Sequence, residues 1–396
     1  MVFRIHRIGQ MFEYKLSDDS WDENEYNSIM DIVNTNMFTM GEKVKNFEKE
    51  FAEKVGAKFS VMVNSGSSAN LLAIASLFYQ GILKENDEII VPAVSWSTTY
   101  YPLYQYRLKL KFIDVDIETL NIDVELLEKA ITKKTRAVFA VNLLGNPNYY
   151  NEIVKLCKNY KLTLIEDNCE SLGAKYENKN TSTFGIIGTN STFYSHHICT
   201  MEGGVLTTDN EELYHNMLVL RAHGWTRDLP EKSAIYEKSQ DSFYESFNFI
   251  LPGYNLRPIE MEGAIGIAQL EKLNMIIKNR RANAEIFKEL FLNSHRFMIQ
   301  KEVGNSSWFG FSLILKKKFQ GKRGDILAKL KANKIDVRPI VAGNFTKNRV
   351  IKYFNYEIFG KLQNADYLHE NGFFIGNHSK KIYDKIEFVH SLIENN

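Results

Sequence analysis

Hydrophobic and polar positions follow two repeating patterns from residue 59 onward. Short runs rich in β-branched and aromatic residues have the composition of buried strands, and longer amphipathic runs between them have helical spacing. The predicted strands are residues 59–65, 87–93, 109–116, 135–145 and 162–168, and the predicted helices are residues 67–81, 124–134 and 149–161. Strands that alternate with such helices form βαβ units, so the sequence predicts an α/β fold with a mainly parallel sheet.

The pattern changes in the second half of the chain. Residues 227–248 are polar and poor in strand pattern, which predicts an excursion across the surface or a subunit boundary. A long helical pattern follows Pro258 and suits a connector between two domains. We therefore expect an N-terminal segment (1–35), a large α/β domain (36–257), a connecting helix (258–293) and a small C-terminal α+β domain (294–396). Residues 1–10 fit no element.

Composition narrows the class of protein. The chain is 44% hydrophobic and 24% charged, which is typical of a globular protein with full cores. Its net charge of +1 creates no overall field toward nucleic acid or an anionic membrane, so neither is an expected partner. No apolar stretch of about 18 residues and no signal-peptide core occurs, which predicts a cytoplasmic protein.

The three cysteines do not indicate a cross-linked or metal-binding protein. Cys157, Cys169 and Cys199 are odd in number, widely spaced and without a CxxC pair. This pattern argues against a disulfide framework, a structural zinc site and an iron–sulfur cluster. We expect free thiols and no metal.

The segment NSGSSAN, residues 64–70, lies between a predicted strand and a predicted helix. Backbone N–H groups around Gly66 and Ser67 would point outward at the helix N-terminus, where a phosphate group can bind. The alternative is an ordinary N-capped helix after a tight turn.

Two further positions have the chemistry of a ligand site. Asp167 ends an apolar strand, where an unpaired carboxylate is costly, so it requires a cationic partner such as a protonated cofactor ring nitrogen. The alternative for Asp167 is an N-cap or loop residue. Trp96 follows a strand and could stack on a flat ligand, although a lone tryptophan is more often part of a core.

These features occur in a specific order: phosphate loop, aromatic platform, strand-end aspartate and then a glycine-rich EGG. Together with the segments VPAVSWSTTYYP, VNLLGNPN, EDNCESLGA, FYSHHICTMEGG, RAHGWTR and LPGYNLRP, this order resembles the sugar aminotransferases of the DegT/DnrJ/EryC1/StrS family. The resemblance covers nearly the whole chain. It implies the aspartate aminotransferase fold (PLP fold type I) and pyridoxal 5'-phosphate as the cofactor.

The sequence departs from this family at the catalytic position. Family members have a lysine before EGG that binds the cofactor covalently, whereas this chain has His196 there and no lysine between Lys179 and Lys232. A histidine with an ordinary pKa can transfer protons at neutral pH, but it cannot form the covalent bond. His196 is therefore the predicted catalytic residue, and the cofactor, pyridoxal or pyridoxamine 5'-phosphate, is expected to bind noncovalently.

The neighbouring His197 is the alternative base. Alternation along a strand would send the two rings to opposite faces, so only one can meet the cofactor. The spacing to Glu202 favours His196 and predicts a packed or hydrogen-bonded ring for His197.

Within the family, the quoted segments are similar to those of members that remove a sugar 3-hydroxyl group in colitose formation for the lipopolysaccharide O-antigen. The resemblance implies GDP-4-keto-6-deoxymannose as the substrate, GDP-4-keto-3,6-dideoxymannose as the product and L-glutamate as the amino donor. Iron–sulfur relatives with a histidine here need clustered cysteines, which this chain lacks. Two alternatives stay open: a nucleotide-sugar 4-aminotransferase, and a non-catalytic protein that binds cofactor or nucleotide sugar.

The resemblance also implies roles for supporting residues. Ser191 matches a serine near the phosphate, and Asn255 matches an asparagine that reaches the phosphate from the partner subunit, which implies a homodimer with shared active sites. Glu170 replaces the usual glutamine beside the cofactor hydroxyl. Because it would lie near Asp167, one of the two carboxyl groups should hold a proton. The predicted cofactor-binding residues are Gly66, Ser67, Trp96, Asp167, Glu170, Ser191 and Asn255.

Three residues are predicted on the substrate side. His223 is expected near the reacting sugar, and the guanidinium of Arg227 suits a diphosphate. Phe247 is expected on a loop that crosses to the other subunit. Surface or packing roles are the alternative for His223 and Arg227.

Overall fold

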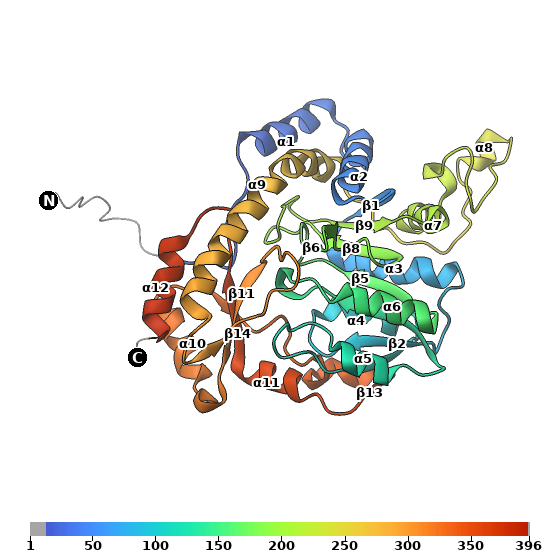
Figure 1. Cartoon of the computed structure of the whole chain (residues 1–396). Coiled ribbons are helices and arrows are strands. Elements are labelled where there is room, and N and C mark those ends of the chain that lie inside the picture. The colour runs from blue at the N-terminus through green and yellow to red at the C-terminus, as the bar shows by residue number, and fades with distance from the viewer. Residues whose placement is uncertain (1–12, 395–396) are drawn as a thin grey trace.

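The computed structural model describes residues 13–394, so residues 1–10, for which no element is predicted, lie outside it. Its main sheet has the strand order β1-β9-β8-β5-β4-β2-β3-β13 (Figure 1). The strands are β1 (Phe59–Val63), β2 (Glu88–Pro92), β3 (Lys109–Ile113), β4 (Thr135–Val141), β5 (Thr163–Asp167), β8 (Ile187–Ser191), β9 (Gly204–Thr208) and β13 (Tyr356–Ile358). Strand β9 runs antiparallel to β1 and β8, whereas the other neighbours pair in parallel. The mainly parallel α/β sheet predicted from the sequence is confirmed.

Helices follow the strands of this sheet. Three of them match the predicted helices: α3 (Gly66–Tyr79), α5 (Val124–Ala130) and α6 (Tyr150–Tyr160). Helices α4 (Ser97–Gln105) and α7 (Glu211–Arg221) were not predicted. The strands are almost entirely buried, as expected when helices cover both faces of a parallel sheet. The carboxyl ends of β4 and β5 therefore meet at one edge, which is where open α/β sheets bind ligands.

The long helix predicted at 258–293 is α9 (Glu260–Phe291). Its first half packs on α1 (Glu23–Thr35) and α2 (Glu42–Val55), and its second half contributes Phe287 and Phe291 to a separate hydrophobic core. That core contains an antiparallel sheet and flanking helices. They are β10 (Phe297–Met298), β11 (Gly310–Leu315), β12 (Val337–Arg338), β14 (Gly372–Gly376), α10 (Arg323–Ala332) and α12 (Tyr383–Glu394). Helix α11 (Gln363–Asn371) instead buries Ala365 and Leu368 in the core of the large sheet.

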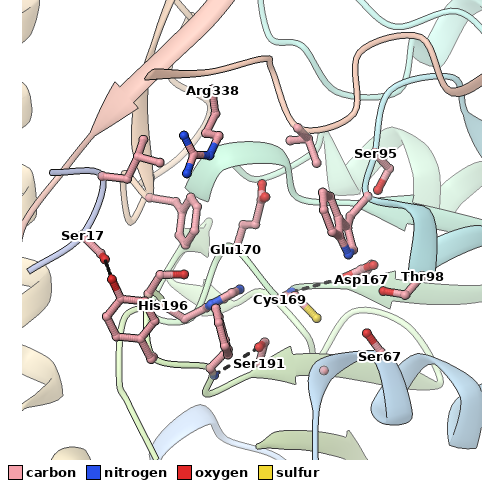
Figure 2. Close-up of a pocket in the computed structure, with 18 of the residues that line it drawn as sticks. Ser17, Ser67, Ser95, Thr98, Asp167, Cys169, Glu170, Ser191, His196 and Arg338 are labelled. Atoms are coloured by element: carbon pink, nitrogen blue, oxygen red, sulfur yellow. Dashed lines mark hydrogen bonds between the residues drawn. The ribbon is translucent and has the colours of Figure 1, made fainter. Parts of the chain in front are cut away.

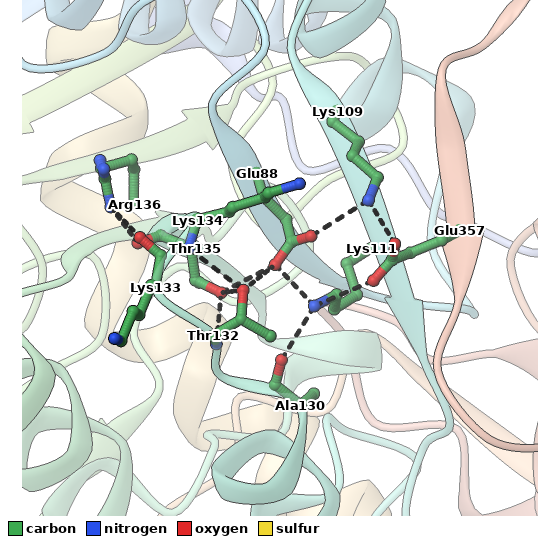
Figure 3. A network of polar contacts seen from close by, with 10 residues as sticks. All are labelled: Glu88, Lys109, Lys111, Ala130, Thr132, Lys133, Lys134, Thr135, Arg136 and Glu357. Atoms are coloured by element: carbon green, nitrogen blue, oxygen red, sulfur yellow. Dashed lines mark hydrogen bonds and ion pairs between the residues drawn. The ribbon is translucent and has the colours of Figure 1, made fainter.

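One segment of the expected small domain lies in the large sheet. Strand β13 pairs in parallel with β3 and completes the sheet at that edge. The buried Nζ of Lys111 on β3 lies 2.6 Å from Glu88 Oε1 and 2.9 Å from Glu357 Oε1 on β13, and Lys109 pairs with the same two carboxylates (Figure 3). Residues 294–396 are thus not a wholly separate unit, and the domain limits stay a prediction.

Two structural facts bear on the expected class of protein. No helix within residues 13–394 is both long and apolar enough to cross a membrane. The cysteines at 157, 169 and 199 are free, and no group of three metal-ligating side chains occurs in the described part of the chain.

Candidate active site

A cavity of about 580 Å³ opens beside the carboxyl end of β5. This volume is in the range of small-molecule sites. Seven of the predicted site residues line it: Gly66, Ser67, Trp96, Asp167, Glu170, Ser191 and His196. Other lining residues come from the large sheet region, from the N-terminal segment and from the small domain, so three parts of the chain meet here.

Asp167 faces the cavity as a buried carboxylate. Its Oδ2 accepts hydrogen bonds from Thr99 Oγ1 (2.7 Å) and Asn70 Nδ2 (2.9 Å), and its Oδ1 accepts one from Cys169 N (3.2 Å). No cationic side chain lies within 4 Å of it among residues 13–394. A buried carboxylate with only neutral donors fits a cationic ring nitrogen in the cavity. This geometry argues against the N-cap alternative.

Asn70 and Thr99 are site residues that were not predicted from the sequence. Thr189 Oγ1 donates to Asn70 Oδ1 (2.6 Å), which fixes the amide so that its nitrogen points to Asp167. Both residues lie inside motifs recognised in the sequence. Their convergence on Asp167 depends on how α3 and α4 pack, which no local pattern reveals.

The phosphate end of the cavity lies at the start of α3. Ser65 caps this helix through a hydrogen bond from Ser68 N (3.1 Å). A Cβ atom at Gly66 would lie 2.7 Å from Ser191 Cβ and 3.1 Å from Cys169 Sγ, so only glycine allows this close approach. Free N–H groups at the helix start, with the hydroxyls of Ser67 and Ser191 beside the same space, suit a phosphate group.

Trp96 lies at the cavity wall and not in the core. It precedes α4, and the residue is 57% exposed. The core alternative is therefore wrong, and the ring is available to stack on a flat ligand. Together, the helix N-terminus, this ring and the Asp167 carboxylate fit a phosphorylated pyridine.

His196 enters the cavity from the loop between β8 and β9, on a different side from Asp167 (Figure 2). Its ring centroid lies 5.1 Å from that of Phe309, and its Nδ1 has no hydrogen-bond partner among the described residues. Burial, and secondly the charge of Arg280, lowers its pKa to about 4. The imidazole is therefore neutral at pH 7 and can accept a proton.

His197 has the packed position that the sequence predicts. Its ring is buried, and its Nε2 lies 3.2 Å from Ser307 O. The two rings separate because this segment is a turn-rich loop, not because they alternate along a strand. The expected outcome holds, but for a different structural reason.

Glu170 lies at the same edge and accepts a hydrogen bond from Leu144 N (2.9 Å). Burial, with the nearby charge of Asp167 also contributing, raises its pKa to about 7. This is the direction expected for two neighbouring carboxyl groups, one of which holds a proton.

Arg338 of β12 is a third residue that was not predicted from the sequence. Its side chain faces the cavity in Figure 2, and within residues 13–394 no carboxylate lies within 4 Å of its guanidinium. Such a group can hold an anionic part of a ligand. A single arginine in a short strand has no spacing signal, so its role could not be predicted.

The other four predicted residues do not line this cavity. His223 N donates to Tyr254 O (2.6 Å), and Asn255 pairs with Ala222, so this stretch folds back on itself. Arg227 lies over the Trp225 ring at 4.2 Å, and Phe247, 69% exposed, contacts the same ring. They flank the segment with α8 (Ser242–Glu245), which extends away from the sheet in Figure 1. Their roles at a site stay predictions.

Comparisons with known proteins agree with this geometry. The chain is 53% identical to a GDP-4-keto-6-deoxy-D-mannose 3-dehydratase of Escherichia coli O55:H7, over 97% of this chain and all of that protein. A solved structure of the Escherichia coli enzyme with bound hydrated PLP has a TM-score of 0.95, 53% identity, and coverage of 97% of this chain and 100% of that one.

A more distant aminotransferase, from Helicobacter pylori pseudoaminic acid biosynthesis, has a TM-score of 0.85 at 22% identity, with coverage of 96% and 98% of the two chains. This likeness shows the shared fold, and the predicted aspartate aminotransferase fold is confirmed. The sequence profile of the DegT/DnrJ/EryC1/StrS aminotransferase family matches residues 19–393. The chain therefore belongs to the DegT/DnrJ/EryC1/StrS aminotransferase family.

Proposed function

We propose that this protein is a pyridoxal-phosphate-dependent 3-dehydratase. It converts GDP-4-keto-6-deoxy-D-mannose to GDP-4-keto-3,6-dideoxymannose and uses L-glutamate as the amino donor. The observation that carries the proposal is the neutral, unpartnered imidazole of His196 at the position where family members have lysine. The near-full-length similarity to an enzyme of this name supports the choice of substrate.

A lysine elsewhere in the cavity does not replace the missing one. Among the described lining residues the single lysine is Lys15, which comes from the N-terminal segment and pairs with Glu13 at 3.5 Å. We therefore propose that the cofactor is held without a covalent bond. The start of α3, with Ser67 and Ser191, would hold its phosphate.

Pyridoxal or pyridoxamine phosphate, when bound, supplies an amino-group carrier and an electron sink. Asp167 would face the ring nitrogen and favour its protonated form, because a buried carboxylate stabilises a cation. Trp96 would cover one face of the ring. Glu170, with its raised pKa, would present a protonated carboxyl group at the ring hydroxyl.

His196 is the proposed proton carrier. Its neutral imidazole can accept a proton and return it, but it cannot form the covalent bond by which lysine displaces a product. Loss of the 3-hydroxyl group as water is then the faster outcome. In the full reaction, hydrogen replaces the 3-hydroxyl group, while glutamate supplies the two electrons and leaves as 2-oxoglutarate and ammonia.

The proposal includes a cytoplasmic homodimer with shared active sites. Asn255, His223, Arg227 and Phe247 would act in the cavity of the partner subunit, since they lie outside their own. Exposed Phe243, Tyr244 and Phe247 on one projecting segment support a protein contact there.

Stoichiometry tests this function. The protein is incubated with pyridoxal phosphate, glutamate and GDP-4-keto-6-deoxymannose, and ammonia and 2-oxoglutarate are measured. We expect one molecule of each per sugar consumed. 2-Oxoglutarate without ammonia would indicate a 4-aminotransferase, and the absence of both would indicate a binding protein. The His196→Asn variant should bind the cofactor but release no ammonia.

A further inference from the structure

Arg280 of α9 is a buried cation that has no role in the reaction proposed above. Its side chain is 2% exposed, and within the described residues no carboxylate lies within 4 Å of its guanidinium. Burial lowers its pKa to about 10, so the group is charged at neutral pH. An unpaired buried charge is costly, and a protein retains one where its field or its hydrogen bonds are needed.

The guanidinium binds the backbone of the segment that carries Phe309. Its Nη1 donates to the carbonyl oxygens of Asn377 (3.0 Å), Phe309 (3.2 Å) and Trp308 (3.4 Å). Three carbonyl dipoles therefore face one charge. This arrangement fixes the backbone at Trp308, Phe309 and Asn377.

The same segment is fixed from two other directions. Phe309 N donates to Leu144 O (3.0 Å), and Ser307 N donates to Gly145 O (2.9 Å), at the end of β4. Ser307 O lies 3.2 Å from His197 Nε2. The Phe309 ring then lies 5.1 Å from His196 and 5.9 Å from His197, measured between ring centroids.

Several charged or titratable groups line the cavity that His196 enters or act on its neighbour. The lining groups are Asp167 at the end of β5, Cys169 and Glu170 after it, Tyr194 and Glu202 in the loop of His196, Lys15 of the N-terminal segment, and Asp336 and Arg338 of the small domain. His196 and Arg280 both act on the pKa of His197. Among them Arg280 is the charge that lowers the pKa of His196, after burial itself. Asp18 is the acid that acts on Arg280 in turn.

We propose that Arg280 is a positioning residue for the proton transfer assigned to His196. Through the carbonyls of Trp308 and Phe309 it holds the Phe309 ring against the imidazole, and its charge favours the neutral imidazole that a proton acceptor needs. The inference rests on the proposed function for the role of His196, but it concerns a residue that touches neither cofactor nor substrate.

The chain offers a matched control in the next residue. Arg281 binds the same segment through Ser306 O (3.0 Å) and Asn305 O (2.9 Å), but its charge does not contribute to the pKa of His196. Arg281→Gln therefore perturbs the segment without removing the charge behind the histidine. Arg280→Lys keeps the charge but cannot reach three carbonyls.

The test is an NMR titration of ¹⁵N-histidine-labelled full-length protein without substrates, with His196 assigned by the signal that His196→Gln lacks. We expect the wild-type His196 ring to stay neutral down to about pH 5. The pKa of His196 should move toward 6.5 in Arg280→Gln, but it should not move in Arg281→Gln or Arg280→Lys. In parallel, the acid limb of kcat/KM should move to higher pH in Arg280→Gln, and kcat should fall in Arg280→Lys with an unchanged pH profile.

A wild-type His196 that titrates near 6.5 would overturn the proposal, and this result needs no variant to fold. The same pKa of His196 in Arg280→Gln and in Arg281→Gln would overturn the proposal as well. Because the titration uses no sugar nucleotide, its outcome is independent of the reaction product. An amino-sugar product would refute the proposed function and leave this measurement standing.

Discussion

His196 occupies the position where the resemblance to sugar aminotransferases places a catalytic lysine. The structure gives the imidazole two properties that the sequence could not reveal: its buried Nδ1 has no hydrogen-bond partner within residues 13–394, and its pKa is lowered to about 4 by burial and by Arg280. From the sequence alone, an ordinary histidine pKa is expected. The lowered pKa makes His196 a weaker base than an ordinary histidine. Its ring is neutral over the whole physiological pH range, so it is ready to accept a proton.

Glu170 predicts a pH-dependent stability. Its pKa rises from 4.5 to about 7 on folding, so the folded state binds this proton more tightly and stability falls as pH rises through that window. Glu170→Gln keeps an acceptor for Leu144 N but cannot ionise. The free energy of unfolding is measured in urea without cofactor for both proteins. The value for the variant minus the value for wild type should be about 2 kcal/mol larger at pH 8 than at pH 5.

Glu53→Gln on the exposed face of α2 is the control, and its difference from wild type should be the same at both pH values. An equal difference for Glu170→Gln at pH 5 and pH 8 would refute the assignment of a protonated carboxyl group.

At the scale of elements, the start of α3 is expected to bind the phosphate group. Gly66→Ala would place a Cβ atom 2.7 Å from Ser191 Cβ and narrow this end of the cavity. The dissociation constant for pyridoxal phosphate should rise about tenfold or more, measured by fluorescence titration. Gly324→Ala in α10, where a Cβ atom meets nothing within 4 Å, should leave the affinity unchanged. Equal affinities of both variants would place the phosphate elsewhere.

The β3–β13 contact predicts a second effect at this scale. Lys111 and Glu88 are almost fully buried, so Lys111→Met leaves a buried carboxylate with a weaker set of partners. The free energy of unfolding should fall by about 3 kcal/mol, with faster hydrogen exchange in β13. Arg107→Met removes an exposed pair with Glu85 and should cost less than about 1 kcal/mol. A similar small loss for both variants would mean that the buried pair does not hold β13.

The sequence predicted most elements of the large sheet because their signals are local. Each of β1 to β5 is an apolar run next to a helical pattern. Strand β13 was missed because three residues with mixed polarity become a strand only through pairing with β3, far away in the chain. In the site, motifs identified Gly66 and Asp167, whereas Asn70, Thr99 and Arg338 depend on tertiary packing that no spacing records.

For the whole molecule, the shared-site proposal makes a quantitative prediction. His196→Asn and Asn255→Ala should each be inactive, since each removes one half of a site. If Asn255 acts in the partner's cavity, a dimer with one subunit of each variant contains one intact site. Co-refolding equal amounts of the two variants should therefore recover about one quarter of wild-type activity. Activity no higher than that of the separate variants would show that Asn255 does not act across subunits.

The central claim is that this protein removes the sugar 3-hydroxyl group and retains no nitrogen in the product. Mass spectrometry of the sugar nucleotide, after incubation with pyridoxal phosphate, glutamate and GDP-4-keto-6-deoxymannose, tests it most directly. We predict a product lighter than the substrate by one oxygen atom and free of added nitrogen. A GDP-linked 4-amino sugar would contradict the claim and show that histidine can replace lysine without redirecting the reaction.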